Sequence, residues 1–151
     1  MKRLITAERV MRLAFSAREE LSPEIITEAD IVEAESRFLL PILGALYEPL
    51  SEGRYAELMA EYVAPVVAIY TRYVAEAHLA ERCAPCRDKS VLVADNARLD
   101  LRLDTLRCKA ATLARRLSDH LNAHADDYAE YDPQHNILNR CSTDGGIVQI
   151  F

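Results

Sequence analysis

Two cysteines separated by two residues are the most chemically suggestive motif in the sequence. Cys83 and Cys86 could form half of a zinc site or a redox dithiol. A redox dithiol is expected where a helix follows a strand, whereas both flanks of this pair have helical patterns. A zinc site needs two more ligands, and His120 and His124, one helical turn apart, lie far outside the usual ligand spacing. We therefore predict ordinary thiols in a loop and no metal, with a zinc-stabilised helical domain as an alternative.

Groupings typical of enzyme active sites do not stand out in the sequence. No Ser-His-Asp or Cys-His grouping has local support, four glycines do not form a phosphate-binding loop, and the Glu-x-x-His pairs of di-iron bundles do not occur. Glu33, Glu35 and Glu57 are single carboxylates at positions expected to be exposed. We expect His124 to be half-buried and hydrogen-bonded, and His78 to lie at the surface. The sequence thus predicts no catalytic residue, no cofactor, no small-molecule substrate and no enzymatic activity.

The charge balance is acidic, with 18 Lys and Arg against 24 Asp and Glu and a net charge of −6. Proteins that bind nucleic acid non-specifically rely on lysine and arginine, so this balance argues against such binding. The clearest basic set is interleaved with aspartates that cancel much of its field: Arg98, Arg102, Lys109 and Arg116 among Asp95, Asp100, Asp104 and Asp119. This mixture predicts a solvated helix face. A small regulatory or nucleic-acid-associated helical module is the alternative.

The apolar periodicity predicts an all-α fold, a bundle of about four helices within residues 1–131. A chain of 151 residues fits one domain with a substantial core. Thr6 is expected to cap the first helix and Thr27 the second. We expect Pro41 to kink or break the second helix, and the stretch 44–53 to form its exit loop.

The third segment, residues 54–82, is apolar over a wide arc. Such an arc is typical of a central helix that is covered from two sides. Pro65 is expected to bend this helix near its middle. Tyr70 and Tyr73 occupy its apolar stripes, which favours core packing over stacking on nucleic-acid bases.

After a polar link at residues 83–90, the longest helical pattern begins at Asp95 or Asn96. About thirty residues of helix would extend about 45 Å. Its apolar positions recur every three or four residues, close to a heptad repeat, at Leu99, Leu103, Leu106, Ala110, Leu113, Leu117, Leu121, His124 and Tyr128. We interpret this seam as a packing surface.

Residues 132–151 are predicted to form a loop and a short apolar C-terminal tail. The stretch 132–146 is rich in Asn, Ser, Asp and Gly, and four apolar residues follow within the last five positions: Ile147, Val148, Ile150 and Phe151. Chain ends in water tend to be polar. The tail therefore either packs on its own domain or adds a strand to a neighbour, which makes these four residues possible oligomer contacts.

No signal peptide and no apolar run of the roughly 20 residues that a membrane span requires are visible in the sequence. We expect no membrane partner and an intracellular location.

A resemblance to a known family rests on the order and lengths of the predicted helices over residues 4–131 and on a few segments and side chains, namely Thr27–Ile31, Phe38–Gly44, Tyr47, Leu50, Tyr55 and Val63–Tyr73. In these features the chain resembles the head–tail connector (adaptor) family of tailed bacteriophages and prophages. The resemblance implies a small helical structural protein without a catalytic motif, located in the host cytoplasm or the virion. Copies of such a protein form a ring between portal and tail. Connector chains are often shorter, and here the long last helix and the tail extend past the common pattern.

Overall fold

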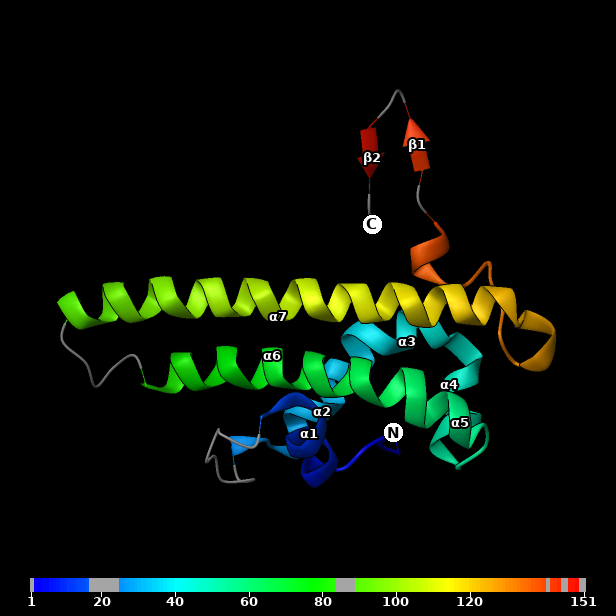
Figure 1. The fold of residues 1–151 in the computed structure, drawn as a ribbon, viewed down its shortest axis with the longest axis horizontal. Coiled ribbons are helices and arrows are strands. Elements are labelled where there is room, and N and C mark those ends of the chain that lie inside the picture. The colour runs from blue at the N-terminus through cyan, green and yellow to red at the C-terminus, as the bar shows by residue number, and fades with distance from the viewer. Residues whose placement is uncertain (1, 17–24, 84–88, 141, 145–146, 150–151) are drawn as a thin grey trace.

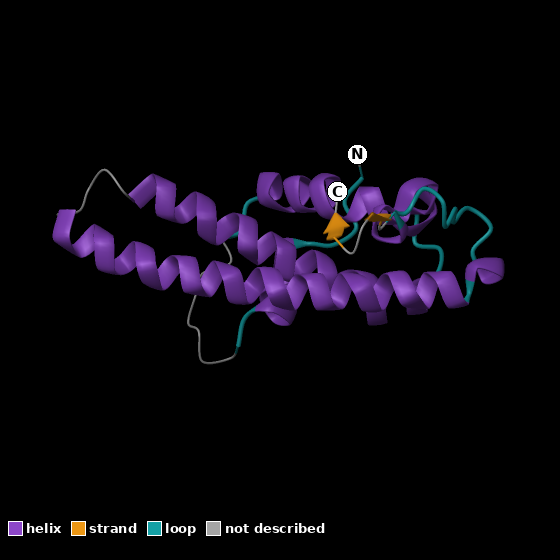
Figure 2. Ribbon diagram, turned by 90° about the horizontal axis from the view of Figure 1, so that it is seen from above, coloured by secondary structure: helices purple, strands orange, loops and turns teal. Residues whose placement is uncertain are grey.

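Two long antiparallel helices form the frame of the fold, α6 (Ala64–Cys83) and α7 (Lys89–Ala123). The computed structural model describes residues 2–16, 25–83, 89–140, 142–144 and 147–149. Figures 1 and 2 show α6 and α7 lying side by side. The predicted fold class is confirmed, because the chain is an all-α bundle with one long helix towards its C-terminal end.

The core is built around α6. Figure 1 shows α6 between α7 on one side and α1 (Ala7–Ala14) and α2 (Glu28–Ala34) on the other. Val66 and Val67, which lie on adjacent faces of α6, are both fully buried. A helix with so wide an apolar arc needs cover from more than one element. The prediction of a central third helix is therefore confirmed.

The first two helices begin at the threonines expected from the sequence. The Thr6 hydroxyl accepts a 3.3 Å hydrogen bond from the amide of Arg9. The Thr27 hydroxyl accepts one of 3.2 Å from the amide of Asp30, whose carboxylate accepts one of 2.9 Å from the Thr27 amide. This reciprocal pair is a capping box, and it satisfies two backbone donors at the start of α2.

Turns of π geometry precede the two prolines that were expected to distort helices. η2 (Glu35–Leu39) comes before Pro41, which lies in α3 (Leu40–Leu43). η4 (Met59–Val63) comes before Pro65, which lies in α6. A proline cannot donate to the carbonyl four residues earlier, and a wider turn accommodates this loss. The chain therefore stays helical through both prolines, and the distortion lies one turn ahead of each.

The exit loop predicted at residues 44–53 is mostly helical, so that prediction is wrong. η3 (Gly44–Leu46) and α4 (Tyr47–Ser51) occupy this stretch, and α5 (Ala56–Leu58) follows it. Tyr47 and Leu50 are buried in the core, and this burial stabilises helical turns that the polar and proline residues of the stretch do not predict. Gly44 turns the chain with a φ of +54°.

Both ends of α7 differ from the prediction. The helix begins at Lys89 and not at Asp95 or Asn96, since no proline or glycine lies between Lys89 and Asp95 to delay it. It ends at Ala123, where His124 leaves helical geometry with a φ of −122°. Tyr128 therefore lies beyond the helix, after η6 (Ala125–Asp127). The middle and end of the predicted seam pack into the core through Leu106, Ala110, Leu117 and Leu121.

The C-terminal stretch contains more structure than a loop. η7 (Ile137–Asn139) packs against α7 and α3. β1 (Ser142–Asp144), predicted as loop, pairs in antiparallel register with β2 (Ile147–Gln149). The intervening Gly145 and Gly146 match the two-residue connection that favours hairpins. In Figure 1 the hairpin stands off the helices.

Among the described residues, no helix combines the length and the apolar character required to cross a membrane.

Candidate functional site

The hairpin rises from a short segment that is fixed to α7 by buried polar groups. Asn136 is fully buried, and its Nδ2 donates to Ser118 Oγ at 2.9 Å and to Tyr131 OH at 2.8 Å. Its Oδ1 accepts a 3.0 Å hydrogen bond from the amide of Leu138, which caps η7. A buried amide is tolerated only when its donors and acceptor are satisfied, and here they are.

A pair of asparagines completes this attachment closer to the hairpin. Asn122 on α7 and Asn139 at the end of η7 donate to each other through their amides, at 2.8 and 2.9 Å. Tyr131 OH donates to Asn122 at 2.8 Å, and Asn139 also donates to the carbonyl of Pro133 at 2.8 Å. Such a connected network fixes the chain just before β1. The base of the hairpin is therefore positioned by α7.

The register of the hairpin determines which backbone groups face outward. Asp144 pairs with Ile147 across two residues, so these two exchange hydrogen bonds, and the next opposed pair, Thr143 and Val148, does not. The N–H and C=O of Val148 consequently point away from β1, to the outer edge of β2. Of the four predicted oligomer-contact residues, Ile147 and Val148 lie in β2, while Ile150 and Phe151 lie outside the described residues.

Glu35 is fully buried, which corrects the prediction that it is exposed. Its Oε1 accepts from the amide of Leu4 at 2.9 Å, and its Oε2 accepts from Tyr47 OH at 2.6 Å. Burial raises the pKa of Glu35, although these hydrogen bonds oppose the shift. The residue was buried because the N-terminal segment and α4 close over it. Its position between Ile31 and Leu39, on an apolar stripe, was the signal in the sequence that could have revealed it.

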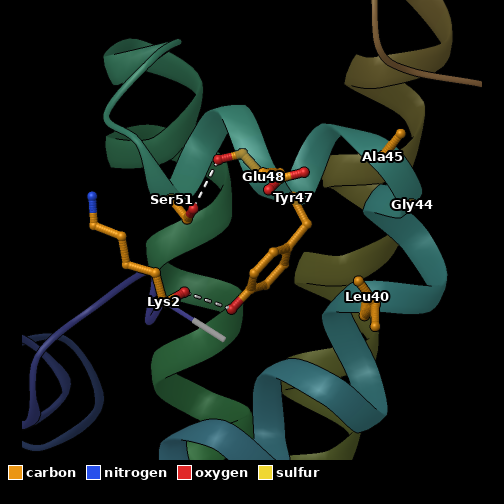
Figure 3. A pocket seen from close by; sticks show the side chains of 7 residues that line it. All are labelled: Lys2, Leu40, Gly44, Ala45, Tyr47, Glu48 and Ser51. Atoms are coloured by element: carbon orange, nitrogen blue, oxygen red, sulfur yellow. Dashed lines mark hydrogen bonds between the residues drawn. The ribbon is translucent and has the colours of Figure 1, made fainter.

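A hollow of about 350 Å³ is lined in part by Tyr47, the partner of Glu35 (Figure 3). Tyr47 OH is 3.1 Å from the carbonyl of Lys2 at its wall, and Ser51 Oγ donates to the carbonyl of Glu48 at 2.8 Å. The Ser51 hydroxyl is thus directed at a backbone acceptor and not at a general base. Leu40, Gly44 and Ala45 form the rest of the lining.

A second buried carboxylate links α2 to α6. Asp30 is 2% exposed, and its Oδ1 lies 2.8 Å from Nδ1 of His78. Nε2 of the same ring is 3.6 Å from Glu33. Burial opposes ionisation of Asp30, but hydrogen bonds from Thr27 and His78 outweigh it and lower the pKa of the carboxyl. His78, predicted at the surface, is half-buried. Both of its nitrogens face carboxylates of α2, so His78 links α6 to α2.

The basic residues predicted along α7 are partly engaged by acidic residues of α6 and η4. Arg102 Nε lies 2.6 Å from Glu76 Oε2, and Arg72 Nε lies 2.7 Å from Glu76 Oε1. Arg116 is 4.0 Å from Glu61. Arg98 and Lys109 are exposed. The four basic residues therefore do not form one continuous free surface for phosphates.

The residues considered as metal ligands are dispersed. Cys83 is the last residue of α6, Cys86 lies outside the described residues, and Cys108 is an exposed thiol on α7. The rings of His120 and His124 stack face to face with centroids 4.4 Å apart. His124 is exposed, not half-buried as predicted, because α7 ends before it, although its Nδ1 does lie 3.0 Å from the carbonyl of His120. Among the described residues, no three potential ligands come together as a metal site requires.

When the chain was compared with known proteins, no family model, no curated protein and no solved structure matched it.

Proposed function

We propose that this chain is a non-catalytic assembly protein, a subunit of the phage or prophage head–tail connector kind. It acts by binding copies of itself and portal or tail proteins, in the host cytoplasm or the virion. The observation that carries the proposal is the isolated two-stranded sheet formed by β1 and β2. A hairpin of two strands is marginally stable in water, and a third strand or a packing partner stabilises it.

The outer edge of β2 is a suitable place for that third strand. The outward N–H and C=O of Val148 match the groups that an added strand would pair with. Apolar residues at Ile147, Val148, Ile150 and Phe151 favour burial against a neighbour. The attachment of residues 131–140 to α7 fixes the chain that leads to the hairpin, as a docking arm requires. The order of the helices, which resembles that of connector subunits, supports the same function.

Sedimentation velocity of the full chain over a wide concentration range tests the assembly. We expect the mass to rise with concentration. Val148→Pro removes the outward N–H and should shift the protein to monomer, because proline cannot donate to a strand pair. Val148→Thr keeps the N–H and a β-favouring side chain, and should assemble like the parent. A parent that stays monomeric throughout, or two variants that assemble equally, would contradict the proposal.

The ring form has a separate test. A head-to-tail contact whose rotation closes gives rings, whereas one that does not close gives filaments. Electron micrographs of the assembled protein should show closed rings. Open filaments, or dimers that do not grow further, would overturn the connector assignment while leaving self-assembly in place.

A further inference from the structure

Five aromatic side chains gather where the start of α5, η4, the end of α7 and the following turn meet. We call this set the aromatic end patch, and it consists of Tyr55, Tyr62, His120, His124 and Tyr128. The rings of Tyr62 and His120 stack with centroids 4.1 Å apart. The ring of His124 also stacks on that of His120, with centroids 4.4 Å apart. Tyr128 OH is 3.0 Å from His120 Nε2, and the Tyr128 ring meets Tyr55 edge to face at 5.1 Å. His124 is exposed and the other four residues are half-buried, so each of the five is partly accessible to solvent.

Rings of this patch already accept guanidinium groups from the chain itself. The guanidinium of Arg116 lies over Tyr62 at 5.4 Å from the ring centroid, and that of Arg54 lies over Tyr55 at 5.2 Å. These distances are within the range in which the electron-rich face of a ring attracts a cation. The patch therefore has the geometry of a cation-binding surface.

Four carboxylates lie in or next to the segments that form the patch, and two of them form no ion pair with another described residue. Glu130 is engaged by Arg54 at 2.6 Å and by Tyr55 OH at 2.8 Å, and Glu61 faces Arg116. Glu57 and Asp127 are exposed, and neither forms an ion pair within the described part of the chain. Burial raises the pKa of Tyr128, and the charges of Asp127 and Glu57 raise it further. The charges of these two carboxylates thus reach Tyr128.

The backbone of Tyr55 adds an independent observation. This residue is the only non-glycine with a positive φ among the described residues, with φ 55° and ψ 50°. A bulky side chain in the left-handed region is strained, and such strain persists where the surroundings hold it, often at functional positions. Here the hydrogen bond to Glu130 and the contact with Tyr128 hold the ring in the patch.

We propose that the aromatic end patch binds an extended basic segment of a partner protein. Arginine or lysine side chains of the segment lie against the rings, and Glu57 and Asp127 supply the opposing charges. A nucleic-acid strand could also stack on these rings, but its phosphates would be repelled by the same carboxylates. The net charge of −6 attracts a basic segment at long range. The patch shares no residue with the β2 edge, so this inference does not depend on the proposed assembly.

Calorimetric titration of the full chain with a short, capped arginine–glycine peptide tests the inference. We expect saturable binding that weakens with added salt. Glu57→Gln combined with Asp127→Asn should weaken it about tenfold, since two charge pairs at a partly exposed site are lost. Asp100→Asn combined with Asp104→Asn changes the net charge equally on a distant part of α7 and should leave the affinity unchanged. All four positions are exposed, so the variants should fold.

A second set of measurements distinguishes a basic segment from nucleic acid or a second copy of the chain as the ligand of the patch. Tyr62→Leu should weaken binding of the arginine peptide, and imidazole proton resonances of His120 and His124 should shift during titration of the parent. No saturable binding, or equal losses in the two double variants, would overturn the inference. Tighter binding of a short oligothymidylate at the same residues would also overturn it, in favour of nucleic acid. A change in sedimenting mass with Tyr62→Leu would overturn it in favour of a contact between copies.

Discussion

The hydroxyl of Tyr47 donates a 2.6 Å hydrogen bond to Oε2 of Glu35, and both side chains are buried. The bond joins α4 to η2, and the amide of Leu4 completes the coordination of the same carboxylate. Burial raises the pKa of Tyr47 strongly, and the neighbouring Glu35 raises it further. Glu35 therefore fastens the N-terminal segment and α4 to the bundle.

Tyr47→Phe is expected to destabilise the protein by about 1–3 kcal/mol, because it leaves a buried carboxylate oxygen without its donor. Tyr73→Phe is the matched control, since the Tyr73 hydroxyl has no hydrogen bond within the described residues and its ring contact with Phe38 is retained. Urea denaturation followed by circular dichroism measures both. Equal stability of the two variants would show that the bond to Glu35 contributes nothing.

The hydrogen bonds that Asp30 accepts from Thr27 and His78 make stability depend on pH. The pKa of Asp30 is lowered from 3.8 in the folded protein, so the unfolded chain binds its proton first as pH falls. The stabilisation is fully present above the unfolded pKa and is lost as pH falls through the folded one. Asp30→Asn should therefore be less stable than the parent at neutral pH. We expect the gap in unfolding free energy to shrink below about pH 4. A gap that widens with acidification would contradict the assignment.

Features that depend only on residues close in the sequence were predictable. The helix caps at Thr6 and Thr27 act within one turn, and the apolar arc of α6 reflects its own periodicity. Glu35 was not predicted correctly because its partner Leu4 lies 31 residues away. The local pattern contained the carboxylate but not the group that would satisfy it, and a charged residue without a visible partner is expected at the surface.

For the candidate surfaces too, features set by nearby residues left a signal in the sequence, and features set by distant residues did not. The glycine pair between Ser142–Asp144 and Ile147–Gln149 was a local hairpin signal, but the weakly β-favouring first strand obscured it. The burial of Asn136 depends on Ser118 of α7, which no spacing within residues 132–146 reveals. The aromatic end patch likewise combines residues from the start of α5 and from η4 with residues from the end of α7 and beyond it.

The buried amide of Asn136 yields a prediction for the base of the hairpin. Asn136→Ala removes two donated hydrogen bonds and the cap of η7, and should cost about 2–3 kcal/mol of unfolding free energy. Gln134→Ala changes an exposed amide in the same segment and should stay within about 0.5 kcal/mol of the parent. Urea denaturation measures both. If Asn136→Ala were as stable as Gln134→Ala, the segment would not be held on α7 in solution.

The left-handed backbone of Tyr55 predicts an inverted order of glycine and alanine. At ordinary positions alanine is more stable than glycine by about 0.5–1 kcal/mol. Tyr55→Ala and Tyr55→Gly both lose the hydrogen bond to Glu130 and the contact with Tyr128. Only glycine relieves the strain of a φ of 55°, which costs about 1–2 kcal/mol for other residues. Tyr55→Gly should therefore be the more stable variant by about 1 kcal/mol in urea denaturation. An alanine variant of equal or greater stability would show that the strained conformation is not maintained.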